Sequence, residues 1–139
     1  MVSEVQRIIH APLEKVWRAA SDFTKSPDPS CPIEIVKKGD DSAGGVGCER
    51  KIKIGRLVVH ERLEAVDPPH SYTYSMLSGG PYKSYLGKVE LTAEGESTRI
   101  RWATSFVSRY PGISWIINKV NIKNYNKFID VLEEQLQLT

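Results

Sequence analysis

The segment from residue 33 to residue 107 constrains the fold most, because closely spaced turn signals divide it into short strand-like runs. Glycine and proline mark turns most strongly, and they fall here at Gly44-Gly45, Gly55-Arg56, Asp67-Pro68-Pro69, Gly79-Gly80-Pro81 and Glu94-Gly95-Glu96. The runs between them predict six strands, at 33–38, 46–54, 57–66, 71–77, 84–93 and 98–107. These connections are too short to hold crossover helices, so the sheet is expected to be antiparallel.

Two helices and one further strand flank this segment. Residues 4–9 read as a strand, and a helix is expected to begin with Pro12 at its first position and to end near Ser21. A last helix is predicted over 113–136, with apolar residues around nearly half of its circumference. Such a wide face suits a helix laid into a concave sheet. We therefore expect one α+β domain over 1–139, with a seven-stranded antiparallel curved sheet wrapped around the C-terminal helix.

The connection over residues 24–32 is expected to be irregular. It contains Pro27, Pro29 and Pro32, which oppose a regular helix. We expect a loop with at most one short helical turn, and we predict that this loop is a mobile lid.

The strands on either side of Gly55-Arg56 can be placed in register. A two-residue turn with glycine first favours a type II′ hairpin. Because strand residues alternate between faces, one face then carries the pairs Ile54–Leu57, Ile52–Val59, Arg50–Glu61 and Cys48–Leu63. The other face carries the mostly polar pairs Lys53–Val58, Lys51–His60 and Glu49–Arg62. The largely apolar set is the inner face, so Arg50 and Glu61 are predicted to point inward.

Two interpretations of this charged pair remain open. Burying two charges costs several kcal/mol per ion, and mutual pairing offsets this only in part. The pair is either a structural ion pair that fixes the hairpin register, or a functional pair. In the second case Arg50 anchors a ligand carbonyl, carboxylate or oxyanion with its planar fork of donors, and Glu61 orients the ligand or moves a proton.

The other candidate ligand-binding residues are mostly aromatic or aliphatic positions on the predicted inner faces. They are Ile52, Val59, Tyr74, Met76, Tyr85, Trp102, Asn121, Tyr125 and Phe128. Each can belong to the core or to a pocket lining, since binding cavities are mostly apolar with few polar groups. Tyr74 and Tyr85 are the hydroxyls most expected to face a ligand. Asn121 needs a hydrogen bond if buried, either to the sheet or to a ligand.

Composition and motifs exclude several classes of function. The net charge of +2 is too small to favour a nucleic-acid partner, and no apolar run is long enough for stable membrane insertion. The three histidines lack metal-ligand spacing, and no cofactor motif is present, so neither metal nor cofactor is expected. Cys31 and Cys48 are read as reduced thiols, which with the absence of a secretory signal favours a cytoplasmic protein. A monomer or weak homodimer is expected.

Four segments in order carry a resemblance to a known family. They are Ile-His-Ala-Pro-Leu-Glu-Lys-Val-Trp at 9–17, Gly-Val-Gly-Cys-Glu-Arg at 45–50, Glu-Arg-Leu-Glu-Ala-Val-Asp-Pro-Pro at 61–69 and Thr-Arg-Ile-Arg-Trp at 98–102. The chain resembles the polyketide cyclase/dehydrase and lipid-transport superfamily, also described as START-like or birch-pollen-allergen-like. The resemblance implies a helix-grip fold. Members often carry an aromatic residue after the first helix, which residues 24–32 lack, so this end of the pocket is expected to be more open.

The resemblance also bears on function. In a plant synthase of this superfamily, an arginine and a glutamate at places matching Arg50 and Glu61 are assigned proton transfer. The first hypothesis is a carrier or sensor that binds a small hydrophobic molecule, such as a lipid or polyketide, in an internal cavity. The alternative is a cofactor-independent cyclase, dehydratase or isomerase that uses Arg50 and Glu61. A protein-partner module with a vestigial pocket is a third hypothesis.

Overall fold

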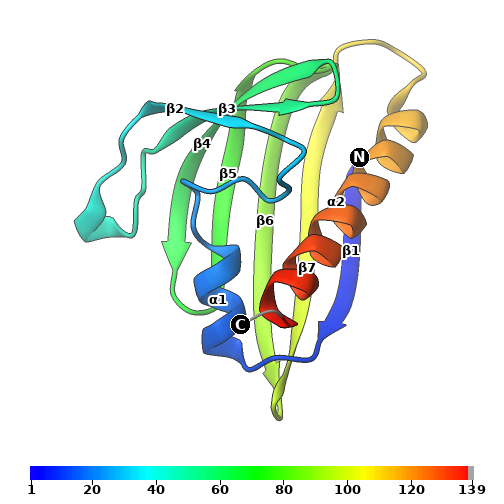
Figure 1. Cartoon of the computed structure of the whole chain (residues 1–139). Coiled ribbons are helices and arrows are strands. Elements are labelled where there is room, and N and C mark those ends of the chain that lie inside the picture. Colours follow the sequence, from blue (N-terminus) through cyan, green and yellow to red (C-terminus); the bar gives the residue numbers. More distant parts are fainter. Residues whose placement is uncertain (138–139) are drawn as a thin grey trace.

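A curved sheet holds a long C-terminal helix on its concave side (Figure 1). The computed structural model describes residues 1–137. The elements in chain order are β1 (Val2–Ile9), α1 (Leu13–Ala20), β2 (Ile33–Lys37), η1 (Asp41–Ala43), β3 (Glu49–Ile54), β4 (Leu57–Asp67), β5 (Ser71–Ser78), β6 (Tyr82–Glu94), β7 (Ser97–Ser108) and α2 (Ser114–Gln137).

The seven strands form one antiparallel sheet in the order β1-β7-β6-β5-β4-β3-β2. Neighbours in the chain are neighbours in the sheet from β2 to β7, whereas β1 joins the far edge beside β7. The helix α2 crosses in front of the sheet, and α1 packs near its C-terminal end (Figure 1). The predicted α+β class and the seven-stranded curved sheet around the last helix are confirmed.

Alternation along the strands builds the concave face. In β7, every second residue from Thr98 to Phe106 is buried, which is the pattern of a strand with one face against a core. The buried stripe of α2 includes Ile117, Tyr125 and Ile129. These two surfaces meet in one hydrophobic core.

The hairpin register was predicted correctly. Ile54 pairs with Leu57, Ile52 with Val59 and Arg50 with Glu61. Gly55 has φ +63°, and within residues 1–137 no residue other than glycine has a positive φ. A type I′ turn would need a positive φ at Arg56 as well, so the turn fits type II′.

Several element boundaries differ from the predicted ones. Strand β3 begins at Glu49 rather than at 46, because residues 44–48 form turns and Val46 makes only an isolated bridge with Asp40. The short helix η1 precedes them, and at its start Asp40 accepts a hydrogen bond from the Ser42 N–H. Cys48 therefore lies before β3, although its carbonyl still accepts from the Leu63 N–H at 2.9 Å. Pro12 is the N-cap of α1 rather than its first helical residue, with an extended ψ of 152°. Residues 21–32 contain turns and bends and no helical turn.

Cys31 and Cys48 are both free and buried. Within residues 1–137, no helix combines the length and the apolar character that a membrane-spanning segment requires.

Candidate ligand-binding site

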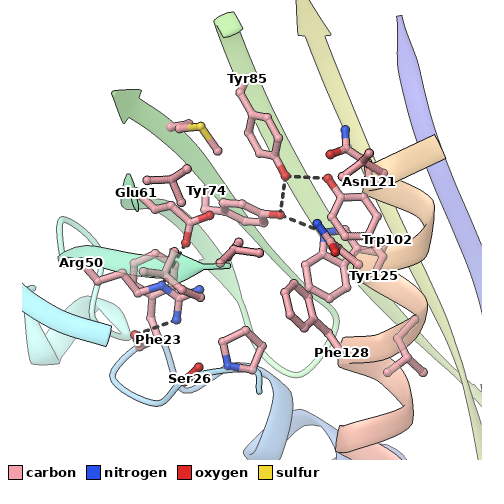
Figure 2. Close-up of a pocket in the computed structure, with 18 of the residues that line it drawn as sticks. Phe23, Ser26, Arg50, Glu61, Tyr74, Tyr85, Trp102, Asn121, Tyr125 and Phe128 are labelled. Atoms are coloured by element: carbon pink, nitrogen blue, oxygen red, sulfur yellow. Dashed lines mark hydrogen bonds and ion pairs between the residues drawn. The ribbon is translucent and has the colours of Figure 1, made fainter. Parts of the chain in front are cut away.

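A cavity of about 420 Å³ lies between the concave face of the sheet, α2 and the loop that follows α1 (Figure 2). Its size falls within the range of small-molecule sites. All eleven residues predicted for the site line it: Arg50, Ile52, Val59, Glu61, Tyr74, Met76, Tyr85, Trp102, Asn121, Tyr125 and Phe128. The structure therefore brings these residues together, and their roles in binding or catalysis stay predictions.

Arg50 and Glu61 form an ion pair in the wall of this cavity. The Nε atom of Arg50 donates to Oε1 of Glu61 at 3.0 Å, and both residues are buried. They meet because β3 and β4 place them directly opposite each other on the concave face. The two interpretations made from the sequence are therefore both still possible, since the partners bind each other and also line the cavity.

The same guanidinium holds the loop after α1. Its Nη1 atom donates to the carbonyl oxygens of Phe23 and Lys25, each at 3.1 Å. The Arg50 Cζ atom lies 3.9 Å from the centre of the Phe23 ring, a cation–π distance. Farther along the loop, Lys127 of α2 lies 3.2 Å from the buried Asp28 carboxylate. These contacts fasten the loop to the cavity wall and to α2, and its predicted movement as a lid stays a prediction.

Arg50 and Glu61 each have one side-chain polar atom that takes no part in these hydrogen bonds. Among residues 1–137, Nη2 of Arg50 and Oε2 of Glu61 have no hydrogen-bond partner, and neither is among the fully covered polar atoms that lack one. Both residues line the cavity, and these two atoms are not fully covered. The pair thus keeps one donor and one acceptor that no protein group uses.

A second polar feature is a cluster of hydroxyl groups that the sequence did not predict as a cluster. Tyr74 and Tyr85 are 3.1 Å apart at their hydroxyls, and Tyr85 and Tyr125 are 2.6 Å apart (Figure 2). Trp102 Nε1 donates to the Tyr74 hydroxyl at 2.9 Å, and Thr104 Oγ1 lies 2.6 Å from the Tyr125 hydroxyl. Trp102 can only donate, so the Tyr74 hydroxyl accepts from it. In one consistent arrangement each hydroxyl then donates to the next, from Tyr74 through Tyr85 and Tyr125 to Thr104.

Burial keeps these tyrosines protonated. It raises the pKa values of Tyr74 and Tyr85 well above their ordinary value, and it raises the pKa of Tyr72, which lines the cavity outside the cluster, to about 12. Burial also raises the pKa of Tyr125. The hydroxyl cluster is therefore a set of neutral hydrogen-bonding groups rather than a source of phenolate bases.

Aromatic rings build the wall beside the cluster. The rings of Trp102 and Tyr125 stack with centroids 4.6 Å apart and an angle of 8° between their planes. Phe128 lies against Trp102 at 5.7 Å. These contacts join β7 to α2 and fix the orientation of the Tyr125 hydroxyl.

Asn121 is bonded to the sheet. Its Oδ1 accepts from the Tyr82 hydroxyl at 2.9 Å, and its Nδ2 donates to Ser3 Oγ at 3.2 Å. These bonds favour the structural interpretation of this buried amide, although Asn121 also lines the cavity.

Phe23, Tyr82 and Thr104 are site residues that the sequence reasoning did not assign. Phe23 is the aromatic residue after the first helix, one position before the stretch in which it was sought. Phe23 is buried. A more open pocket was expected on the premise that an aromatic residue is missing after the first helix, and that premise was wrong. Thr104 shares the inner face of β7 with Trp102, so strand alternation places it there, but nothing in the sequence shows its bond to Tyr125.

No group of three His, Cys, Asp or Glu side chains in the described part of the chain is arranged to hold a metal ion.

The fold is a helix-grip sheet around a mostly apolar cavity with a few polar groups. This architecture is typical of proteins that bind small molecules. The family model described as "Polyketide cyclase / dehydrase and lipid transport" matches residues 2–134. The chain belongs to this family. No curated protein matches the sequence significantly.

Solved structures share the fold at low sequence identity. A START superfamily protein from Mycobacterium smegmatis is 14% identical with a TM-score of 0.83, covering 99% of each chain. Ara h 8.0201 is 18% identical with a TM-score of 0.79, covering 100% of this chain and 99% of its own. Norcoclaurine synthase from Thalictrum flavum, solved with dopamine and hydroxybenzaldehyde, is 17% identical with a TM-score of 0.77, covering 99% of this chain and 86% of its own.

Proposed function

We propose that this protein binds one small hydrophobic molecule that carries oxygen substituents, as a carrier or sensor. The cavity of about 420 Å³ is the observation that carries this proposal. Its walls are mostly apolar, which favours an apolar ligand body because burial removes that surface from water. The Arg50–Glu61 pair and the tyrosine hydroxyls offer partners to oxygen atoms on such a ligand.

The test is direct detection of a ligand. Native mass spectrometry of protein purified from its own host is expected to show a retained adduct, and lipid or polyketide panels are expected to raise the melting temperature. The variant Ala20→Trp places a large ring at a cavity-lining position and should weaken binding roughly tenfold or more, about 1.4 kcal/mol.

Ala65→Trp is the matched control, because Ala65 is exposed and does not line the cavity. It should bind as the unaltered protein does. No adduct together with no thermal shift across the panels would rule the proposal out, and so would equal binding by the Ala20 and Ala65 variants.

A second candidate function is proton transfer on the bound molecule. Oε2 of Glu61 and Nη2 of Arg50, which bond no protein group in a pair that lines the cavity, favour it, and norcoclaurine synthase shows that this fold is compatible with catalysis. Arg50 would polarise a ligand carbonyl, while Glu61 removes a proton from the adjacent carbon and returns it to another atom. The net reaction is an isomerisation that needs no cofactor.

Glu61→Gln separates this function from binding. The amide keeps an oxygen for Arg50 Nε and the shape of the carboxylate, but it cannot accept a proton at the working pH. We expect ligand affinity within about threefold of the original and turnover lowered by roughly 100-fold or more, the usual contribution of a positioned base. Unchanged turnover in a folded Glu61→Gln variant would remove Glu61 from the mechanism.

A further inference from the structure

The mouth of the cavity is apolar and exposed to solvent. Leu57, Ile116 and Val120 line the cavity and still have relative exposures of 42%, 45% and 50%. Leu57 is the first residue of β4, directly after the β3–β4 turn, and Ile116 and Val120 lie on the first half of α2. The β3–β4 turn and the start of α2 are at the upper end of the molecule in Figure 1. The other exposed lining residues, Lys25 and Gln135, are polar and lie on the loop after α1 and near the end of α2.

Trp115 extends this apolar surface. It is the most exposed large hydrophobic residue of those described, at 59%, and it immediately precedes Ile116 on α2. The Lys119 ammonium lies 5.3 Å from the centre of its ring. We call the surface formed by Leu57, Trp115, Ile116, Lys119 and Val120 the entrance face.

Three connections surround the entrance face and lie close together: the β3–β4 turn, the β5–β6 connection and the β7–α2 connection. A side chain on Gly79 would meet the Val58 carbonyl oxygen at 2.4 Å, so the β5–β6 connection lies against the start of β4. A side chain on Gly80 would lie 3.8 Å from Leu57 Cδ2. The Arg109 N–H donates to the Pro81 carbonyl at 2.7 Å, which joins the β7–α2 connection to the same group.

The chain segments that contain these connections and the first half of α2 carry basic side chains but no acidic ones. Residues 50–60, 68–89 and 97–129 contain no Asp or Glu. The exposed cations that lie in or next to the three connections, or on the first half of α2, are Lys53, Arg56, Lys83, Arg109 and Lys119. Within residues 1–137 none of the five forms a salt bridge.

We propose that the entrance face docks on an anionic phospholipid bilayer and opens the cavity directly to the membrane. Exposed Trp and aliphatic side chains enter the interfacial layer, where Trp is favoured. Lys and Arg around them remain at the level of the headgroups, where anionic lipids attract each cation. An apolar ligand then passes between bilayer and cavity without crossing water.

The geometry favours a bilayer over an acidic protein partner. The apolar residues of the entrance face surround an opening into an apolar cavity. The cations are spread over β3, the β3–β4 turn, β6, the β7–α2 connection and α2 rather than in one row. A fluid surface with many negative headgroups matches such a spread without a fixed register. The docking does not depend on the identity of the ligand, so a failed ligand screen would leave it standing.

Vesicle binding tests the proposal. The full chain is expected to sediment with vesicles of phosphatidylcholine and about one third phosphatidylserine at least about tenfold more strongly than with phosphatidylcholine alone. Raising the salt from about 0.1 M to 1 M shortens the screening length from about 10 Å to 3 Å and should release the protein. Trp emission should shift to shorter wavelength on binding and be quenched by brominated lipids, and Trp115→Phe should abolish both signals.

Matched charge reversals provide the control. Arg56→Glu and Lys119→Glu should each weaken binding at least about threefold, whereas Lys88→Glu, an equal charge change on an exposed position of β6, should not. Equal effects of all three variants would overturn the proposal, as would binding without a change in Trp115 emission. Binding to soluble polyglutamate as tight as to the vesicles would point to an acidic protein partner and would also overturn it.

Discussion

Replacing Arg50 by methionine is expected to lower the free energy of unfolding by about 3–5 kcal/mol, the usual effect of leaving one partner of a buried ion pair alone. Glu61 would keep a buried carboxylate without its cation. The carbonyls of Phe23 and Lys25 would lose their donor, and the loop after α1 would lose its attachment to the cavity wall. Urea unfolding of the variant and the original protein measures the difference.

The double variant Arg50→Met/Glu61→Leu separates charge from packing. Replacing both partners by apolar residues removes the unpaired charge, and such replacements are often neutral or stabilising. We expect the double variant to recover most of the lost stability, so that the two substitutions are strongly non-additive. A loss below about 1 kcal/mol in Arg50→Met would show that the pair and its loop contacts contribute little.

Replacing Gly87 by alanine is expected to destabilise the protein by about 3 kcal/mol, from overpacking and broken hydrogen bonds. Gly87 lies opposite Tyr74 in the β5–β6 ladder, and a methyl group there would be 2.4 Å from Tyr74 Cζ. The ring is buried and bonded to Trp102 and Tyr85, so it cannot move aside without breaking the hydroxyl cluster. Ligand affinity should fall together with stability, because Tyr74 lines the cavity.

The sign of the Gly87→Ala effect is itself informative. In a strand that has space for it, alanine is more favourable than glycine by about 0.5–1 kcal/mol. In a Tyr74→Leu background the methyl group would meet a smaller side chain, and the cost of Gly87→Ala should shrink markedly. Near-ultraviolet circular dichroism and urea unfolding would show both changes, and a Gly87→Ala protein as stable as the original would contradict the packing argument.

The sequence predicts the sheet well because its signals are local. Turn residues separate the strands, and the alternation on both sides of Gly55 fixes a register that brings Arg50 opposite Glu61. Strand alternation also places Tyr74, Tyr85 and Trp102 on inner faces. All of these depend on spacing along one or two adjacent strands, which a single sequence contains.

The remaining features depend on distances between parts that are far apart in the chain. Tyr85 and Tyr125 are separated by 40 residues, and their hydroxyl contact depends on sheet curvature and on the axial position of α2. The wide apolar arc of α2 predicts burial of Val120, but this residue is 50% exposed because it lies at the mouth of the cavity. The cation–π contact between the Phe23 ring and the Arg50 guanidinium depends on the path of a loop whose sequence has no periodic pattern.

The pairing of β1 with β7 has a consequence for the order in which the chain can fold. Strands β2 to β7 each pair with a neighbour in sequence, but Val2 pairs with Ser105, and the amino group of Met1 donates to the Phe106 carbonyl 105 residues away. Contacts between such distant residues slow folding, because a long loop must close before they form. During synthesis β1 therefore remains without its partner until β7 has emerged, and it can join the sheet only after the other six strands are available.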